Sequence, residues 1–137
     1  MPAVIVDTGP IVALLNPSDR WHEWSVEQFR GYRAPLVTCE SVFSEASYIV
    51  RPHSKGREAL LGLIRQGVIR IAFDLQTEVE LVDRLMRRYA NVPMSFADAC
   101  LVRMSEINTA SVVCTLDADF HVYRRNGRQR ITVHVPG

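Results

Sequence analysis

Short apolar runs that alternate with longer amphipathic stretches constrain the fold of this chain most. The short runs are rich in β-branched residues and predict strands over residues 4–6, 36–38, 68–72, 112–115 and 131–133. Apolar residues at helical spacing predict helices over residues 8–15, 20–31, 40–50, 55–66, 77–89 and 96–108, with one or two helical turns over 119–124. Because helices separate the strands, we expect the strands to run parallel with helices on both faces. The sequence therefore predicts an α/β fold, a three-layer α/β/α sandwich around a central parallel sheet of four to five strands.

The length of 137 residues fits one hydrophobic core, and no linker, repeat or low-complexity tract interrupts it, so we expect a single domain over residues 1–137. No uncharged apolar run approaches the roughly 20 residues of a membrane span. The first residues also lack the basic segment of a signal peptide. Cys39, Cys100 and Cys114 are odd in number and widely spaced, which is typical of free thiols in a reducing compartment. We therefore expect a cytoplasmic protein with no membrane partner.

The basic residues are almost all of one type. The net charge is +1, and Lys55 is the only lysine beside 15 arginines. Because Lys55 is followed by Gly56 rather than by Ser or Thr, a phosphate-binding loop is excluded. A response-regulator receiver domain is excluded as well, since no lysine follows a late strand. The small net charge also argues against a protein that holds nucleic acid by charge alone.

Acidic residues stand at positions that the predicted sheet brings together. Asp7 directly follows the first strand, and Asp117 lies just after the fourth, with Asp119 close behind. Glu45 and Asp98 stand on helices in apolar company, where an unneutralised carboxylate is costly. Functional crevices of parallel sheets lie outside the carboxyl ends of the strands. The four positions together therefore indicate a carboxylate cluster at that edge.

Each acid taken alone also has a purely structural explanation. Asp7 could cap the helix that follows it, and Asp98 could favour the dipole of its own helix from the first turn. Glu45 could be a solvated helix position, and Asp117 and Asp119 could be turn residues. Only the joint pattern favours a functional site.

Clustered carboxylates need a positive partner. Within about 4–6 Å of one another they repel and their pKa values rise. No lysine stands near these motifs in the sequence, so a divalent cation is the natural partner. Oxygen ligands suit Mg²⁺ or Mn²⁺, which can lower the pKa of a water molecule and neutralise a phosphodiester.

With these motifs the chain resembles the PIN-domain family, and within it the VapC-like ribonuclease toxins of prokaryotic toxin–antitoxin pairs. The resemblance spans nearly the whole chain and is most specific in residues 4–15, 42–46, 95–99 and 115–120. It implies an Mg²⁺- or Mn²⁺-dependent endoribonuclease that attacks phosphorus in line and leaves 5′-phosphate and 3′-hydroxyl ends. The implied partners are an RNA substrate, a small antitoxin and a second copy of the chain in a homodimer.

The resemblance also assigns roles to individual residues. It implies that Asp7, Asp98 and Asp117 hold metal, and that Glu45 holds metal through water or orients the attacking water. Thr115 would steady Asp117 or a water, Asp119 matches a fifth acid of some members, and Thr8 would contact substrate. The implied catalytic set is Asp7, Glu45, Asp98, Thr115 and Asp117, and the implied metal set is Asp7, Glu45, Asp98, Asp117 and Asp119.

An acidic pocket repels RNA, so basic residues should flank it. Arg124, Arg125 and Arg128 are the predicted substrate-binding residues, with Arg130 nearby. Two further groups have two interpretations each. One group is RNA contacts or a solvated helix face: Arg84, Arg87 and Arg88. The other stacks bases or belongs to the core or an interface: Trp21 and Trp24.

An apolar helix surface that could serve a homodimer is expected around Met86, Tyr89 and Met94.

Two other functions compete with the nuclease. A phosphotransferase of the haloacid-dehalogenase class also places an Asp after its first strand, but it requires a second Asp where this chain has Gly9, and a suitable lysine is missing. A non-catalytic RNA-binding module on the same fold is the other alternative. The intact acid set argues against it, because acids without metal repel phosphate.

Overall fold

The computed structural model describes residues 2–137 and shows a five-stranded, fully parallel sheet in the order β3-β2-β1-β4-β7. From the N-terminus to the end of α6, the strands and helices are β1 (Val4–Val6), α1 (Thr8–Leu15), α2 (His22–Gly31), β2 (Leu36–Thr38), α3 (Glu40–Val50), α4 (Gly56–Arg65), β3 (Ile69–Ile71), α5 (Leu75–Arg88) and α6 (Phe96–Ile107). The remaining elements are β4 (Val112–Cys114), a 3₁₀ turn η1 (Ala118–His121), β5 (Arg124–Arg125), β6 (Gln129–Arg130) and β7 (Val133–His134).

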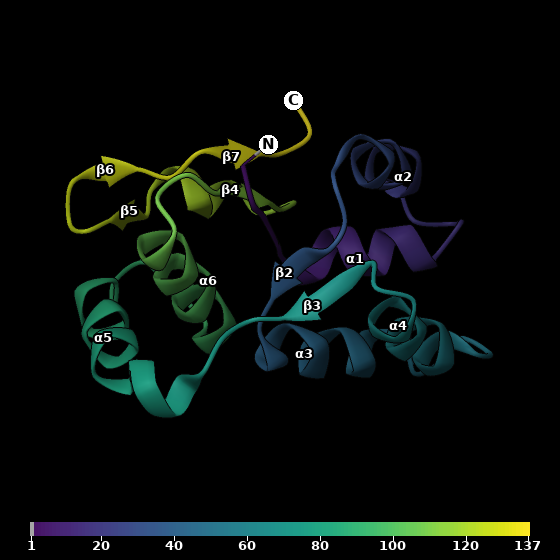
Figure 1. Cartoon of the computed structure of the whole chain (residues 1–137), viewed down its shortest axis with the longest axis horizontal. Coiled ribbons are helices and arrows are strands. Elements are labelled where there is room, and N and C mark those ends of the chain that lie inside the picture. The colour runs from purple at the N-terminus through teal and green to yellow at the C-terminus, as the bar shows by residue number, and fades with distance from the viewer. Residues whose placement is uncertain (1) are drawn as a thin grey trace.

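Helices cover both faces of this sheet. α1, α2, α3 and α4 lie together on one side, and α5 and α6 lie on the other with the β5–β6 hairpin (Figure 1). The predicted α/β/α sandwich is therefore confirmed.

The central strands are buried on both faces, which explains their unbroken apolar sequences. β1 and β4 are buried at every position and pair in register through Val4 with Val112 and Val6 with Cys114. Burying one such side chain contributes roughly 1.5–3 kcal/mol. Because both strands end at the same edge, the residues that follow them, Asp7 and Thr115, are brought side by side.

Local capping explains where α1 and α6 begin. The Asp7 side chain accepts a hydrogen bond from the Thr8 N–H and caps α1. Ser95 and Asp98 form a reciprocal capping box at the start of α6. The structural explanations offered for these two acids are thus confirmed, and their carboxylates lie at the ends of helices because of them.

The C-terminal segment departs from the sequence prediction. The helical turn expected over residues 119–124 is present but shorter, over Ala118–His121, and a short hairpin that was not expected begins at Arg124. Asn126 and Gly127 have positive φ angles of 52° and 77°, and an Asn-Gly pair is a strong signal for a tight hairpin turn. The final strand is Val133–His134 rather than residues 131–133, and α5 begins at Leu75 because Asp74 caps it.

The environments of several aromatic residues are also settled. Tyr89 is buried and packs edge-on against Tyr123, so the predicted apolar dimer surface around Met86, Tyr89 and Met94 is wrong at its centre. Trp24 packs against the hydrophobic core, as its structural interpretation expects.

Over residues 2–137, no helix combines the length and the apolar character needed to cross a bilayer.

Candidate active site

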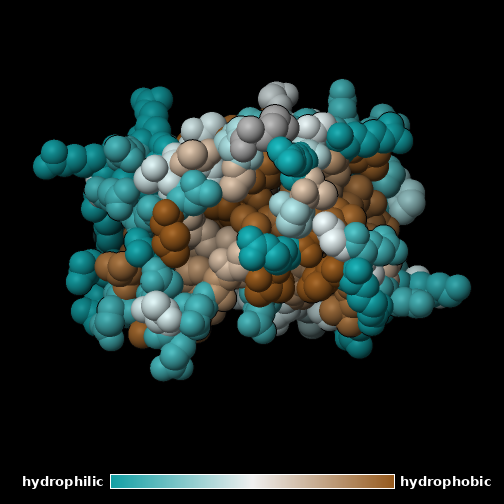
Figure 2. Space-filling view, in the orientation of Figure 1, coloured by the Kyte–Doolittle hydropathy of each residue, from teal (hydrophilic) through white to brown (hydrophobic). Residues whose placement is uncertain are grey.

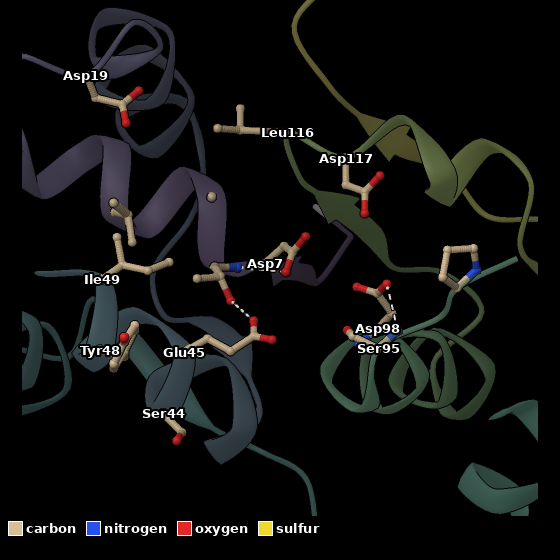
Figure 3. Close-up of a pocket in the computed structure, with 14 residues that line it drawn as sticks. Asp7, Asp19, Ser44, Glu45, Tyr48, Ile49, Ser95, Asp98, Leu116 and Asp117 are labelled. Atoms are coloured by element: carbon tan, nitrogen blue, oxygen red, sulfur yellow. Dashed lines mark hydrogen bonds between the residues drawn. The ribbon is translucent and has the colours of Figure 1, made fainter.

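A cavity of about 1090 Å³ opens at the carboxyl edge of the sheet, between α1 and α3 on one side and α6 on the other (Figure 3). Five carboxylates line it, and none of its lining residues in the described part of the chain is Arg, Lys or His. We call this cavity the acid pocket. Its acids are Asp7, Asp19, Glu45, Asp98 and Asp117.

Thr115 links two of these acids. Its Oγ1 donates to Asp7 Oδ2 at 2.7 Å and accepts from the Asp117 N–H at 2.9 Å. Thr115 is fully buried, so neither bond competes with solvent. The hydroxyl therefore fixes the Asp7 carboxylate and the loop that carries Asp117 relative to each other.

Glu45 reaches the pocket from the exposed side of α3. Its neighbours Val42, Phe43 and Ala46 are buried and anchor the helix, while Glu45 faces the cavity. Thr8 Oγ1 donates to Glu45 Oε1 at 2.6 Å. The predicted substrate-binding residue Thr8 thus lines the pocket and also orients Glu45.

Asp98 enters from the first turn of α6 on the opposite wall. Its Oδ2 accepts the Ser95 N–H at 3.3 Å and the hydroxyl of Tyr123 at 3.0 Å. Tyr123 is fully buried and packs against the rings of Phe120 and Tyr89. Sequence reasoning missed Tyr123 as a site residue, because nothing in local spacing marks a tyrosine 25 positions away as the partner of Asp98.

Burial and mutual repulsion make this pocket electrostatically unfavourable without a cation. The pKa of Asp7 is raised to about 6. Burial is the largest cause, the charges of Asp98 and Glu45 add to the rise, and the hydrogen bonds from Thr115 and Thr8 oppose it. Burial also raises the pKa of Asp98, and the charge of Asp117 adds to that rise. These are the shifts expected of carboxylates that share a site with no positive partner.

The donor set fits a divalent metal ion in chemistry and charge. The carboxylates of Asp7, Glu45, Asp98 and Asp117 face one another across the cavity (Figure 3), and oxygen donors are what Mg²⁺ and Mn²⁺ prefer. They are not preassembled, because among residues 2–137 no three His, Cys, Asp or Glu side chains form a group that could hold an ion as they stand. The hydrogen bonds from Thr8, Thr115 and Tyr123 hold Glu45, Asp7 and Asp98 in these positions.

Other predicted site residues lie elsewhere. Asp119 does not line the pocket; its N–H donates to Asp117 Oδ1 at 2.9 Å. Arg124, Arg125 and Arg128 also do not line it and belong to the β5–β6 hairpin. Asp19, which no sequence signal singled out, lines the pocket, and its carboxylate accepts the Trp21 N–H at 2.8 Å.

Comparisons with known proteins agree with the fold. The solved structure of VapC20 from Mycobacterium tuberculosis, described as a sarcin–ricin loop cleaving toxin, matches with a TM-score of 0.76 and 21% identity over 88% of this chain and 94% of that one. No curated protein sequence matches the chain at a significant level. The model of the PIN domain matches residues 4–126, which contain every acid of the pocket and nearly the whole fold. On this match, the chain belongs to the PIN domain family.

Proposed function

We propose that this protein is a divalent-metal-dependent endoribonuclease and the toxin of a toxin–antitoxin pair. The observation that carries the proposal is the acid pocket. Five carboxylates line one cavity at the carboxyl edge of the sheet, and none of its lining residues in the described chain is Arg, Lys or His. The likeness to a toxin that cleaves the sarcin–ricin loop supports RNA as the substrate class.

Asp7, Asp98 and Asp117 would hold the metal, with Glu45 at the rim of the same cavity. When bound, a divalent cation supplies the positive charge that a phosphodiester in the transition state requires and makes a water molecule more acidic. Mg²⁺ and Mn²⁺ both suit this oxygen donor set. Asp119 would act on Asp117 through its N–H rather than as a direct ligand.

The protein's own residues would then position the reaction. Thr8 holds one oxygen of Glu45, and the other oxygen faces the cavity, where it can accept a proton from the attacking water (Figure 3). Thr115 would hold Asp7 and the backbone of Asp117 in fixed relative positions through its two hydrogen bonds. Tyr123 would hold Asp98 in place on the other wall of the pocket. In-line attack by water on phosphorus would leave 5′-phosphate and 3′-hydroxyl ends.

The test uses a synthetic stem-loop that carries the sarcin–ricin loop sequence, together with a total ribosomal RNA preparation. The wild-type protein should cut RNA with Mg²⁺ or Mn²⁺ and stop when EDTA is added. Asp98→Asn should abolish cleavage, whereas the control Asp83→Asn, at an exposed position of α5, should cut normally. Cleavage that persists in EDTA or in Asp98→Asn would contradict the proposal, and binding without cleavage would favour a non-catalytic RNA-binding module.

We also propose a small antitoxin and a homodimer as partners of this protein in the cytoplasm. Induced expression should arrest growth, and Asp7→Ala should relieve the arrest. Light scattering of the purified protein measures whether it is a dimer. Growth that is unaffected by the wild-type protein would contradict the toxin role without contradicting nuclease chemistry.

A further inference from the structure

The acid pocket leaves open how a polyanion is held next to five carboxylates. None of its lining residues in the described chain carries positive charge, so RNA must be attracted by charge outside it. The chain has suitable side chains for this, since 15 of its 16 basic residues are arginine, whose planar guanidinium group is the side chain best suited to binding phosphate.

Arginines gather on the other side of α6, away from the pocket. The second half of α5 carries Arg84, Arg87 and Arg88, and the β5–β6 hairpin carries four more arginines. No Asp or Glu occurs in residues 120–137. Figure 2 shows hydrophilic side chains projecting from the end of the molecule where Figure 1 places α5 and the hairpin.

Specific contacts fix the hairpin onto α5 and α6. Arg88 Nη2 donates to the Gly127 carbonyl at 2.9 Å, and the Arg124 N–H donates to the Tyr89 hydroxyl at 2.8 Å. The Asn126 N–H donates to Glu106 Oε2 at 2.6 Å. Gly127 has a φ of 77°, and a Cβ there would lie 3.0 Å from Arg88 Nη1. The hairpin and α5 therefore form one continuous surface.

A concave site of about 300 Å³ lies in this surface, between α5, α6 and the hairpin turn. Arg84 and Arg88 line it beside Asn126 and Gly127. Arg128 follows Gly127 directly in the turn, and its side chain is exposed. We call Arg84, Arg88 and Arg128 the arginine surface.

Two nearby arginines are paired with carboxylates, and this separates them from the arginine surface. Arg87 pairs with Asp83 at 2.6 Å, and Arg103 pairs with Glu78 and Glu106. Arg124 donates from Nη1 to the carbonyls of residues 121–123. Within residues 2–137, none of the three arginines of the arginine surface has a carboxylate within ion-pair distance. Arg125 is not part of this surface, because its Nε and Nη1 atoms are buried.

We propose that the arginine surface binds phosphates of the RNA backbone at a site separate from the acid pocket. This inference rests on the proposed function, because it names how that substrate is held. Guanidinium groups without carboxylate partners offer forked donors to phosphate oxygens, and such contacts fix position without reading sequence. Tyr123, which contacts Asp98, directly precedes Arg124 at the base of the hairpin, so the surface and the pocket share one rigid connection.

The test compares two double variants that remove the same charge. R84A/R128A removes two exposed arginines of the arginine surface, and the control R57A/R65A removes two exposed arginines from α4, at the opposite end of the molecule in Figure 1. Affinity for the labelled stem-loop is measured by fluorescence anisotropy in EDTA over a series of KCl concentrations. Thermal melts check that both variants fold.

R84A/R128A should bind RNA about tenfold more weakly than wild type, and the slope of log affinity against log salt should be smaller by about two, one for each lost phosphate contact. R57A/R65A should stay near wild type in both measurements. With Mn²⁺ present, R84A/R128A should raise KM and leave kcat unchanged. If the two variants bind alike, the proposal is overturned and an acidic protein segment becomes the occupant to test; if no protein cuts RNA, the nuclease proposal fails instead.

Discussion

The acid pocket lies between the two helix layers, whereas the arginine surface lies on the outside of α5 and the hairpin. Like charges gather in both, but their settings differ. Asp7 and Asp98 are buried at 8% exposure each, whereas Arg84 and Arg128 are solvent-exposed. Water screens the arginines, while the carboxylates lose hydration and repel one another at short range.

The comparison shows that the same accumulation of charge has opposite consequences for folding. Exposed arginines add attraction for a polyanion at little cost to the folded state. Buried carboxylates destabilise the folded state until a cation or a proton neutralises them. The pocket is therefore the region where stability and function oppose each other, and the surface is the region where they do not.

The largest expected effect comes from removing one charge at the centre of the pocket. Asp7→Asn keeps the side-chain shape and the cap on α1, but it removes the charge of a proposed metal ligand and the oxygen that accepts from Thr115. We therefore expect RNA cleavage to fall by about 10³-fold or more. The measurement is the initial cleavage rate of the stem-loop in Mn²⁺. Asp74→Asn, which also caps a helix but lies outside the pocket, is the matched control and should cut like wild type.

The same substitution should stabilise the metal-free protein. The folded-state pKa of Asp7 is about 6 against an ordinary value of 3.8, which corresponds to about 3 kcal/mol when the carboxylate is ionised. At neutral pH in EDTA, Asp7→Asn should therefore raise the free energy of unfolding by up to that amount, measured by urea denaturation. A difference in stability between the two proteins that is the same at acid and at neutral pH would show that the Asp7 carboxylate is not destabilised by burial and by its acidic neighbours.

The pH dependence of that difference sharpens the test. Below pH 3.8 Asp7 is protonated in both the folded and the unfolded protein, so its full stabilising contribution is present. This contribution is lost as the pH rises through about 6, because the folded protein must then hold a buried charge. The stability advantage of Asp7→Asn should accordingly grow across this window, whereas Asp74→Asn should show no such growth.

Metal ions should reverse the repulsion. A ligand that binds only the folded state adds about 2.7 kcal/mol at a concentration one hundred times its Kd. Mn²⁺ or Mg²⁺ should therefore raise the Tm of the wild-type protein, and EDTA should restore the original value. Asp7→Asn should gain much less, and equal gains in both proteins would place the ion outside the acid pocket.

A smaller effect on metal binding is expected when the hydroxyl of Tyr123, which contacts Asp98 from the core, is removed. Tyr123→Phe removes the hydroxyl that donates to Asp98 and leaves the ring packing intact. Losing one hydrogen bond to a charged group costs about 1.5–3 kcal/mol at most. We expect Mn²⁺ affinity, measured by electron paramagnetic resonance, to fall about tenfold. Tyr32→Phe, which also loses a tyrosine hydroxyl but does not line the pocket, should leave Mn²⁺ affinity unchanged.

The smallest effect is expected on the outer face of α5. Arg87 pairs with Asp83 four residues earlier, and its side chain is 79% exposed. Such pairs contribute about 0.3–0.5 kcal/mol. Arg87→Ala should change the free energy of unfolding by no more than that in denaturant titrations. A change of several kcal/mol would show that this face of α5 is packed against something else.

Much of the site follows from local sequence signals, and some of it does not. Asp7 and Asp117 lie beyond strand ends, and Asp98 lies in the first turn of a capped helix, so periodicity and capping were enough to bring them to one edge. Asp119 and the hairpin arginines follow Asp117 closely in the sequence, yet they do not line the pocket. Nearness along the chain does not determine which way a side chain points after a turn.

The alternation of apolar runs with amphipathic helices determined the layered fold, because only a buried parallel sheet satisfies unbroken runs such as β1 and β4. The same sequence determined the caps and the charge balance, which depend on neighbouring residues. Only the tertiary structure decided the partners that join distant segments: Thr115 with Asp7, Tyr123 with Asp98, and Arg88 with the hairpin carbonyl. The physical reason is that such contacts depend on how the elements pack against one another, and packing is a property of the whole chain rather than of any window within it.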